Sequence, residues 1–252
     1  MIVANLATYP PRRSNLLHVV QALAPQVDRL NVILNEFDSE LPELDAFETV
    51  RQILPNYDTK DVGKFYPNVS DADFVLLVDD DLLYPDDYVA KTIERFEALG
   101  KGRYLAGYHA SLYQLPAVSV SPKKMWKWLK FREDRIADHR KVFVFYKGLP
   151  KAVVVDQIAS GTAIIRGADM PPHEYMQGSQ KFVDVRLAKW CFEQGIRPVA
   201  MPREAGWIGQ VRFEETIYHG FTRQNPAHVA EEIWSFAFKV QGRGATLDGE
   251  RS

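Results

Sequence analysis

Three features are scarce in this sequence of 252 residues, and each scarcity excludes a class of protein. Cys191 is the only cysteine, so no disulfide can form within the chain, and we expect a reducing compartment. No apolar stretch approaches the roughly 20 residues that a membrane-spanning helix needs. Positive charge is not in excess, because the formal net charge is −2, and this argues against a nucleic-acid partner.

A targeting signal is also missing from the first residues, MIVANLATYPP. This stretch has no charged leader before its short apolar run, so it does not resemble a signal peptide, and we expect a cytoplasmic protein. Hydrophobic residues make up 46% of the chain and charged residues 25%, which is typical of a globular protein with a substantial core.

The first hundred residues alternate between predicted strands and helices. Short apolar runs at 2–8, 30–34 and 73–78 indicate strands. Apolar residues spaced three or four apart indicate helices around 16–23 and 89–96. The polar span between the second and third strands reads as a loop. This alternation predicts a mainly parallel sheet flanked by helices.

The later part of the chain is less regular. Residues 141–156 are expected to form the two strands of a hairpin, and 161–166 another short strand. A helix is expected from Asp184 to a C-cap at Gly195. The residues after Gln241, GRGATLDGERS, have the composition of a disordered tail.

A run of three carboxylates, Asp79, Asp80 and Asp81, directly follows the apolar stretch DFVLLV. Adjacent like charges raise the cost of ionising one another, so we expect a cation beside them. Alternate residues of an extended segment face the same side, so Asp79 and Asp81 should share one side and Asp80 the other. Ligands bind beyond the carboxyl ends of parallel strands, where aspartate oxygens suit Mg²⁺ or Mn²⁺ together with substrate phosphates. The alternative is that the aspartates cap the following helix or end the strand in solvent.

Five short motifs follow one another over roughly residues 1–220: ATYPPRR (7–13), DVGKF (61–65), VDDDLLYPDDYV (78–89), SGTAIIR (160–166) and FVDVRLAKWCFEQGIRPVAMPREAGW (182–207). Their order and spacing resemble the metal-dependent glycosyltransferases of the GT-A fold, of the bacterial polysaccharide-building kind related to glycosyltransferase family 2. VDDDLLYPDDYV resembles that family's DxD motif. The insertion from about 109 to 155 matches no segment of the family.

The resemblance implies a fold and a domain organisation. The fold would be α/β and GT-A-like (Rossmann-type), with a mainly parallel sheet flanked by helices and a short antiparallel part on the acceptor side. One catalytic domain would cover 1–240, with a donor half at about 1–108 and an acceptor half at about 109–240. Residues 241–252 would form the disordered tail.

The resemblance also assigns roles to residues. Asp81 would be the direct metal ligand, and Asp79 would approach the donor ribose or reach the metal through water. His219 would be brought to the same metal, the alternative being a partly buried imidazole. Asp184 would be the general base. The remaining contacts to the nucleotide sugar would come from residues in three of the motifs: Thr8, Tyr9, Arg12, Asp61, Lys64, Asp79 and Asp80.

Asp184 departs from the family pattern in one respect. Many relatives have two acidic residues together at this point, whereas the neighbours here are Val183 and Val185. The alternative role for Asp184 is the N-cap of its own helix. Both roles suit a carboxylate at the start of a helix.

The function implied is the transfer of a sugar from a nucleoside-diphosphate sugar, taken to be a UDP-sugar, to a glycan or lipid-linked glycan during bacterial surface polysaccharide synthesis. A divalent cation, Mn²⁺ or Mg²⁺, would stabilise the diphosphate leaving group, and one base would accept the proton of the attacking hydroxyl, with inversion at the anomeric carbon. One alternative is a sugar-phosphate nucleotidyltransferase, although ATYPPRR lacks the glycines of a phosphate loop. Another is a non-catalytic module that binds nucleotides or carbohydrates.

Basic and aromatic residues alternate in the segment Lys123–Arg132. The segment could seat the protein on the inner face of the cell membrane or on a lipid-linked acceptor. It could also cover the acceptor as a lid, or form a solvated helix face. Trp207 and Trp234 could stack on a sugar or simply pack, and Cys191 is expected in the core.

Overall fold

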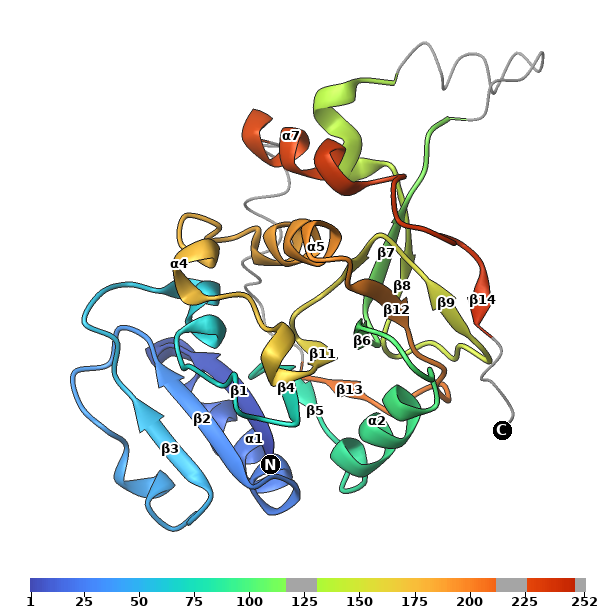
Figure 1. The fold of residues 1–252 in the computed structure, drawn as a ribbon. Helices are drawn as coiled ribbons and strands as arrows, with labels where there is room; N and C mark the ends of the chain where they lie inside the picture. The colour runs from blue at the N-terminus through green and yellow to red at the C-terminus, as the bar shows by residue number, and fades with distance from the viewer. Residues whose placement is uncertain (117–130, 212–225, 248–252) are drawn as a thin grey trace.

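The computed structural model describes residues 1–116, 131–211 and 226–247, and its centre is a twisted mixed sheet (Figure 1). Within these residues the main sheet has nine strands in the order β14–β9–β12–β6–β11–β4–β1–β2–β3. The bounds of these strands are β1 (Ile2–Thr8), β2 (Arg29–Leu34), β3 (Val50–Ile53), β4 (Phe74–Val78), β6 (Tyr104–Gly107), β9 (Ala152–Val154), β11 (Thr162–Ile165), β12 (Arg197–Ala200) and β14 (Thr246–Leu247).

Two smaller antiparallel sheets lie beside the main one. The first has the order β10–β7–β8 and the second pairs β13 with β5. Their strands are β5 (Leu82–Leu83), β7 (Ala110–Tyr113), β8 (Arg140–Phe143), β10 (Gln157–Ile158) and β13 (Gly209–Gln210).

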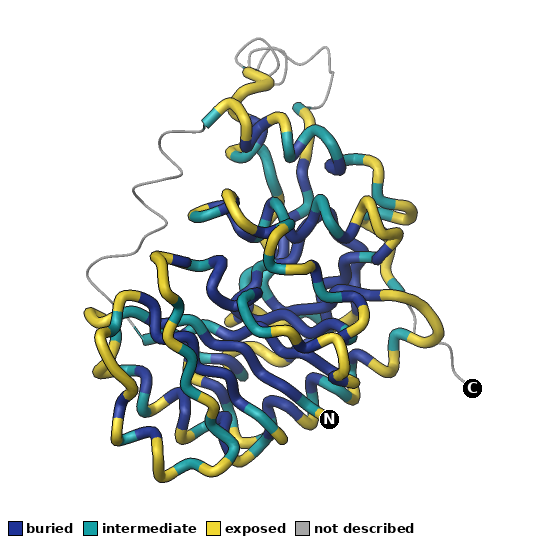
Figure 2. The backbone as a smooth tube through the Cα atoms, turned by 60° about the vertical axis from the view of Figure 1, so that its left-hand side comes forward, coloured by how far each residue is buried: buried dark blue, intermediate teal, exposed yellow. Residues whose placement is uncertain are grey.

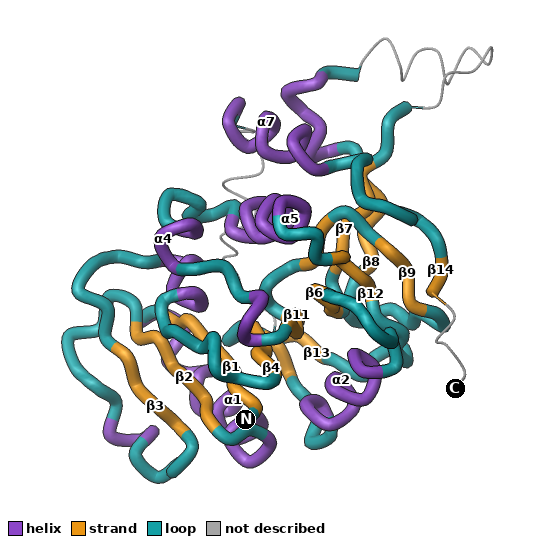
Figure 3. Tube along the Cα trace, in the orientation of Figure 1, coloured by secondary structure: helices purple, strands orange, loops and turns teal. Residues whose placement is uncertain are grey.

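Helices lie on both faces of the main sheet (Figure 3). The α-helices are α1 (Arg13–Leu23), α2 (Tyr88–Glu97), α4 (His173–Met176), α5 (Val183–Glu193) and α7 (Ala227–Phe236). Short 3₁₀ helices connect them: η1 (Pro10–Arg12), η2 (Ala24–Gln26), η3 (Pro42–Leu44), η4 (Lys60–Phe65), η5 (Glu133–Asp138) and η6 (Gly167–Asp169).

The pairing of the strands gives their relative directions. β1 pairs in parallel with both β2 and β4, and β12 pairs in parallel with β6. β11 runs the other way between β4 and β6, antiparallel to both. The predicted α/β fold, with a mainly parallel sheet and a short antiparallel part, is confirmed.

β4 is buried on both of its faces, which explains its continuous apolar sequence. Leu76 and Val78 face a core cluster shared with α1 and α2, whereas Val75 and Leu77 face a second cluster shared with η4 and α5. Cys191 is buried in this second cluster, as the sequence predicts. Figure 2 shows the buried strands running through the middle of the molecule.

Three local predictions differ from the structure. The polar span between β2 and β4 is not only loop, since it contains η3 and the edge strand β3, whose half-exposed residues give little apolar periodicity. Residues 141–156 do not form a hairpin, because β8 pairs with β7 while β9 pairs with β12 and β14. The predicted disordered tail contains β14, whose backbone pairs with β9 although its side chains carry no strand pattern.

No helix among the described residues is both long and apolar enough to cross a membrane.

Candidate active site

One edge of the main sheet gathers the residues that the sequence predicts to be functional. Leu6 of β1 pairs with Val78 of β4, and Thr162 of β11 pairs with the same Val78. Because β1 and β4 are parallel and β11 is antiparallel, the carboxyl ends of the first two meet the amino end of the third. This edge is where open α/β sheets bind ligands.

Asp80 is the buried anchor of this edge. Its carboxylate accepts a hydrogen bond of 2.7 Å from the Thr8 hydroxyl and another from the Arg12 guanidinium. Arg12 also lies 3.6 Å from the carboxylate of Asp81, so one guanidinium bridges two of the three aspartates. The Tyr9 ring stands beside it, 5.7 Å from the guanidinium carbon.

The pKa values of these groups reflect both their burial and the charges of their neighbours. Burial raises the pKa of Asp80, despite the opposing Arg12. Burial, together with the charge of Asp79, raises the pKa of Asp81 to about 6. Burial disfavours the charge of Arg12, but Asp80 and Asp81 outweigh it and raise the pKa of the guanidinium. A second cation beside Asp79 and Asp81 would remove the remaining repulsion.

Lys64 of η4 binds the first of the three aspartates, Asp79. Its ammonium donates to the Asp79 carboxylate and to the Ser160 carbonyl, the latter at 3.3 Å. The Lys64 side chain is only 5% exposed whereas that of Asp79 is 40% exposed, so the lysine is a fixed charge and the carboxylate faces solvent. Although burial lowers the pKa of Lys64, the charge of Asp79 raises it above its usual value.

A chain of two buried asparagines holds η4, and with it Lys64, against the sheet. The Asn5 amide in β1 donates to the Lys64 carbonyl at 2.8 Å, and the Asn31 amide in β2 donates to the Asn5 side chain at 2.8 Å. Both asparagines are buried. Sequence analysis missed them, although polar residues inside the apolar runs IVANLAT and RLNVIL were a visible signal.

Asp184 is the second residue of α5, and its carboxylate points away from its own helix. The backbone N–H of Ser160 donates to its Oδ1 at 2.8 Å. The residue at the N-cap position is Phe182, and no side chain caps this helix. The alternative in which Asp184 is the N-cap is therefore wrong. Burial raises the pKa of Asp184, which makes the carboxylate a stronger proton acceptor when it is ionised.

The backbone of Ser160 links Asp184 to Lys64. Its N–H binds Asp184 and its C=O binds Lys64. The next residue, Gly161, is required by the close approach of Asp79, since a Cβ at this position would lie 1.8 Å from Asp79 Oδ2. The SGT stretch therefore connects Asp79, Lys64 and Asp184 in one cluster.

Asp61 lies beside this cluster rather than at the sheet edge. Its carboxylate accepts two hydrogen bonds from the backbone N–H of Lys181, at 2.8 and 3.0 Å. Burial raises the pKa of Asp61 to about 6, and the nearby charge of Asp184 adds to the shift. Asp61 thus joins η4, to which it belongs, to the turn just before α5, while the predicted nucleotide contact remains a prediction.

Tyr84 contacts the cluster and His109 lies near it, and the motifs assigned a role to neither residue. The Tyr84 hydroxyl accepts from the Asp79 N–H at 2.8 Å and donates to the Gly161 carbonyl at 3.0 Å, so it fixes the backbone at both sides of the edge. His109 follows β6, and burial lowers its pKa to about 4. His109 appeared in the sequence as a lone histidine, and only the pairing of β6 with β11 brings it close.

The remaining predicted residues fall elsewhere. Trp207 packs against Tyr88 with ring centroids 5.7 Å apart, and its indole N–H donates to Asp87 at 2.9 Å. The indole N–H of Trp234 donates to the Glu133 carbonyl at 3.0 Å.

His219 and most of the segment Lys123–Arg132 lie outside the described residues. In the part that the structure describes, no three His, Cys, Asp or Glu side chains converge as a complete metal site.

Comparison with solved structures identifies the architecture. Glucosyl-3-phosphoglycerate synthase from Mycobacterium tuberculosis, in complex with phosphoglyceric acid, matches over 92% of this chain and 79% of its own, with 14% identity and a TM-score of 0.54. The fold is GT-A-like. A crystal structure described as a mycobacterial protein matches over 89% of this chain and 72% of its own, with 12% identity and a TM-score of 0.50.

4-Diphosphocytidyl-2C-methyl-D-erythritol synthase matches over 89% of this chain and 97% of its own, with 13% identity and a TM-score of 0.49. No protein-family model matches the chain, and a comparison with curated proteins found no match. At these identities the similarity to solved structures concerns the fold, and the chemistry must be argued from the site itself.

Proposed function

We propose that this protein transfers a sugar from a nucleoside-diphosphate sugar to a hydroxyl group of an acceptor glycan. One observation carries the proposal: Lys64, buried at the sheet edge, lies between Asp79 and Asp184, and the Ser160 peptide joins it to Asp184. A phosphate-binding cation, a metal-binding carboxylate and a candidate base are thereby held in one cluster on a GT-A-like fold.

The donor side consists of Thr8, Tyr9, Arg12 and Lys64. Arg12 and Lys64 supply fixed positive charge for the diphosphate, which gains negative charge as the sugar leaves. Tyr9 offers a ring face for the nucleobase, and we take the donor to be a UDP-sugar. Asp80 acts through its neighbours, because both of its oxygens are engaged with Thr8 and Arg12.

The carboxylates of Asp79 and Asp81 fit a divalent cation of the Mg²⁺ or Mn²⁺ kind. Such ions are bound by one or two carboxylates together with substrate phosphates rather than by a complete protein cage. Burial, and then the charge of Asp79, raise the pKa of Asp81 to about 6, and a cation beside these two carboxylates would favour their ionised forms. When bound, the ion would neutralise charge on the diphosphate oxygens. His219 is the further ligand that we propose.

Asp184 accepts the proton of the acceptor hydroxyl. The hydroxyl oxygen then forms a bond to the anomeric carbon from the side opposite the diphosphate, and the bond to the diphosphate oxygen breaks. The products are the inverted glycoside and the nucleoside diphosphate, with the proton on Asp184. A base placed in this way contributes roughly 10²- to 10⁴-fold to the rate.

Bacterial surface polysaccharide synthesis is the setting that we propose for this reaction, with a glycan or lipid-linked glycan as acceptor. The chemistry at the cluster needs only a hydroxyl group. The segment Lys123–Arg132 would contact a membrane or lipid-linked acceptor through its basic and aromatic residues.

The experiment that tests the proposal changes Asp81 to Asn, which keeps the shape of the side chain and removes its charge. Binding of UDP, measured by titration calorimetry, should strengthen at least about tenfold with Mn²⁺ in the parent, and this gain should disappear in Asp81→Asn. Asp86→Asn is the matched control, since Asp86 is an exposed aspartate in the same motif, and it should keep the gain.

A product assay separates this function from its alternatives. The parent protein with a UDP-sugar and Mn²⁺ should release UDP and slowly hydrolyse the donor even without an acceptor. A nucleotidyltransferase would instead release pyrophosphate from a nucleoside triphosphate and a sugar phosphate. A non-catalytic module would bind UDP and release nothing. Equal Mn²⁺ dependence in the parent and in Asp81→Asn would remove the metal from this site.

A further inference from the structure

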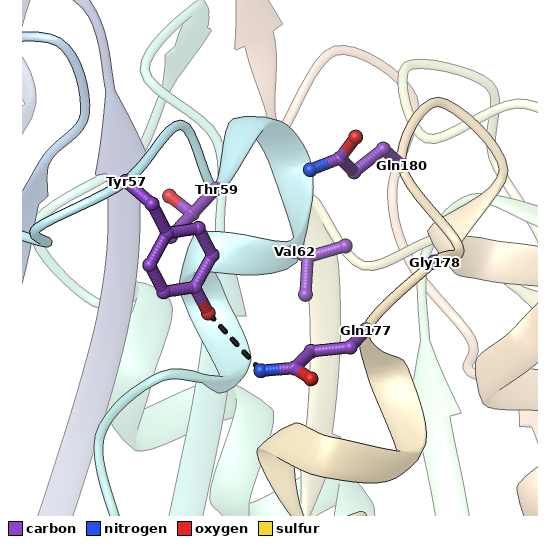
Figure 4. Close-up of a pocket in the computed structure, with 6 residues that line it drawn as sticks. All are labelled: Tyr57, Thr59, Val62, Gln177, Gly178 and Gln180. Carbon is purple, nitrogen blue, oxygen red and sulfur yellow. Dashed lines mark hydrogen bonds between the residues drawn. The ribbon is translucent and has the colours of Figure 1, made fainter.

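A pocket of about 280 Å³ opens beside the cluster, between the loop that leads into η4 and the loop that follows α4 (Figure 4). None of the residues that line it carries a charge. They combine one aromatic ring with a hydroxyl group, two amides and a residue without a side chain: Tyr57, Thr59, Val62, Gln177, Gly178 and Gln180.

The Tyr57 ring forms the aromatic wall of the pocket and packs against two other rings. The Tyr57 ring lies 6.3 Å from that of Tyr66 and 6.2 Å from that of His173, and the last two rings meet edge to face at 5.1 Å. The Tyr57 hydroxyl contacts His173 and accepts from the Gln177 amide at 3.3 Å. Tyr57 nevertheless remains 41% exposed, so an ordered ring face is offered to solvent.

The two glutamines are anchored by their nitrogens. Gln177 donates to the Tyr57 hydroxyl, and Gln180 donates to the Asp58 carbonyl at 3.0 Å. Within the described residues neither amide oxygen has a hydrogen-bond partner, so both can accept from a ligand hydroxyl. Gly178 has a φ of +80° and nothing within 4 Å of its Cβ position, which leaves the pocket mouth open.

Both walls of the pocket adjoin Asp61, whose pKa is raised in part by the charge of the candidate base Asp184. Val62 follows Asp61 in the chain, and Gln180 precedes Lys181, whose N–H donates to Asp61. The Asp61 carboxylate thus ties the two walls together through Lys181, which lies three residues before Asp184 in the chain. An occupant of the pocket would therefore lie against the two segments that Asp61 joins, and the charge of Asp184 acts on this same carboxylate.

We propose that this pocket is an acceptor subsite that binds a neutral sugar ring, stacked on Tyr57 with its hydroxyls bonded to Gln177 and Gln180. The apolar face of a pyranose suits an aromatic wall, and its hydroxyls suit uncharged amide groups. The absence of a cationic side chain in the lining argues against a phosphorylated or carboxylated ring. This inference rests on the proposed function, since it names the class of acceptor that the base would serve.

Binding can be tested without a donor, by saturation-transfer NMR on the full chain. The probes are methyl glucoside, methyl galactoside and methyl mannoside, compared with glucuronate and 3-phosphoglycerate. At least one neutral glycoside should bind the parent, and Tyr57→Ala should weaken it by about tenfold or more. Tyr57→Phe keeps the ring and should retain most of the binding.

The matched control is Tyr146→Ala, which removes another half-exposed tyrosine from outside the pocket and should leave binding unchanged. Equal melting temperatures would show that Tyr57→Ala is folded. The proposal is overturned if no neutral glycoside binds the parent, if only the anions bind, or if Tyr57→Ala binds as the parent does.

Failure of this subsite and failure of the proposed function give different results. Donor hydrolysis by the parent tests the function and needs no acceptor. Hydrolysis together with no neutral-sugar binding would leave the transferase and remove the subsite. Neutral-sugar binding that depends on Tyr57, together with no hydrolysis under any metal, would leave a carbohydrate site and remove the transferase.

Discussion

Buried charged and polar groups are stabilised differently in residues 1–108 and in residues 109–247. In the first region charged side chains bind one another at the sheet edge, as in the pairs Arg12–Asp80 and Lys64–Asp79. In the second region buried charged groups also bind backbone: Asp184 accepts from the Ser160 N–H, Arg203 donates to three carbonyls at 2.8 to 3.2 Å, and Asp156 accepts from the Tyr113 N–H as well as from Arg243.

The difference indicates which groups are available to a ligand. A pair such as Lys64–Asp79 can exchange one partner for a phosphate or a cation without unfolding the chain, because the carboxylate is partly exposed. A buried side chain that satisfies backbone groups has no such freedom, since removing it leaves those groups unpaired. Deleting such a side chain should therefore cost stability, whereas a change that keeps the hydrogen-bond acceptor, as Asp184→Asn does, should separate loss of function from loss of stability.

The largest effect is expected at Asp156, which is fully buried. Its carboxylate accepts from the Tyr113 N–H at 2.8 Å and from Arg243 at 2.8 and 3.0 Å. Asp156→Ala should lower the free energy of unfolding by about 3–5 kcal/mol, since it removes the charged partner of the partly buried Arg243 guanidinium and the acceptor of the Tyr113 N–H. Urea unfolding followed by circular dichroism measures this change.

An exposed aspartate provides the comparison. Asp134→Ala breaks a surface pair with Arg132 and should cost less than about 1 kcal/mol. Similar losses in Asp156→Ala and Asp134→Ala would mean that backbone-bound carboxylates do not stabilise the second region.

The next effect is on the rate. Asp184→Asn should reduce sugar transfer by about 10²-fold or more, because the acceptor hydroxyl loses its proton acceptor. The melting temperature should change little, because the amide oxygen of asparagine can still accept from the Ser160 N–H. Glu174→Gln, at an exposed position in α4, is the control and should keep the parent rate. Asp184→Asn at the parent rate would exclude Asp184 as the base.

At Asp61 we expect a smaller effect, in which the substitution raises the free energy of unfolding instead of lowering it. Its pKa is about 6 in the folded protein and about 3.9 in an unfolded chain, so the folded state binds the proton more tightly. Stability should therefore fall as pH rises from about 4 through 6. Asp61→Asn removes this loss and should raise the free energy of unfolding at pH 7 by about 1–3 kcal/mol, with little change at pH 4.

Asp58→Asn, three residues earlier, should show the opposite sign. Hydrogen bonds from Asn35 and Lys60 lower the pKa of Asp58 despite the opposing effect of burial. Its ionised form therefore favours the folded state, and the variant should be less stable than the parent at pH 7. Denaturant titrations of both variants at pH 4 and pH 7 measure the two signs. A destabilised Asp61→Asn at pH 7 would contradict the assigned burial of Asp61.

Most of the first region was predictable from sequence because β1, β2 and β4 are largely buried and α1 and α2 have a clear apolar period, whereas the half-exposed edge strand β3 was missed. The carboxylate run Asp79–Asp81 then fell at the end of a strand, which placed it at the ligand-binding edge. The predicted alternation of the three aspartates is met only in part, because β4 ends at Val78 and Asp80 and Asp81 lie in a turn. Asp79 and Asp80 have separate partners, Lys64 and Arg12, but Arg12 also lies 3.6 Å from Asp81.

The second region was less predictable because its strands are only two to four residues long and pair across large distances in sequence. β9, for example, pairs with β12 and β14, and no local signal separates this from a hairpin with β8. The partners of Asp184 were hidden for the same reason: the Ser160 peptide reaches it only through the antiparallel insertion of β11.

Gly161 is a position at which a single substitution would disturb the candidate site. A methyl group there would displace the Asp79 carboxylate from Lys64, since the three atoms nearest to that methyl group all belong to Asp79. A glycine codon becomes an alanine codon by one base change, so a single mutation would disturb the Lys64–Asp79 contact without altering any of the three aspartates.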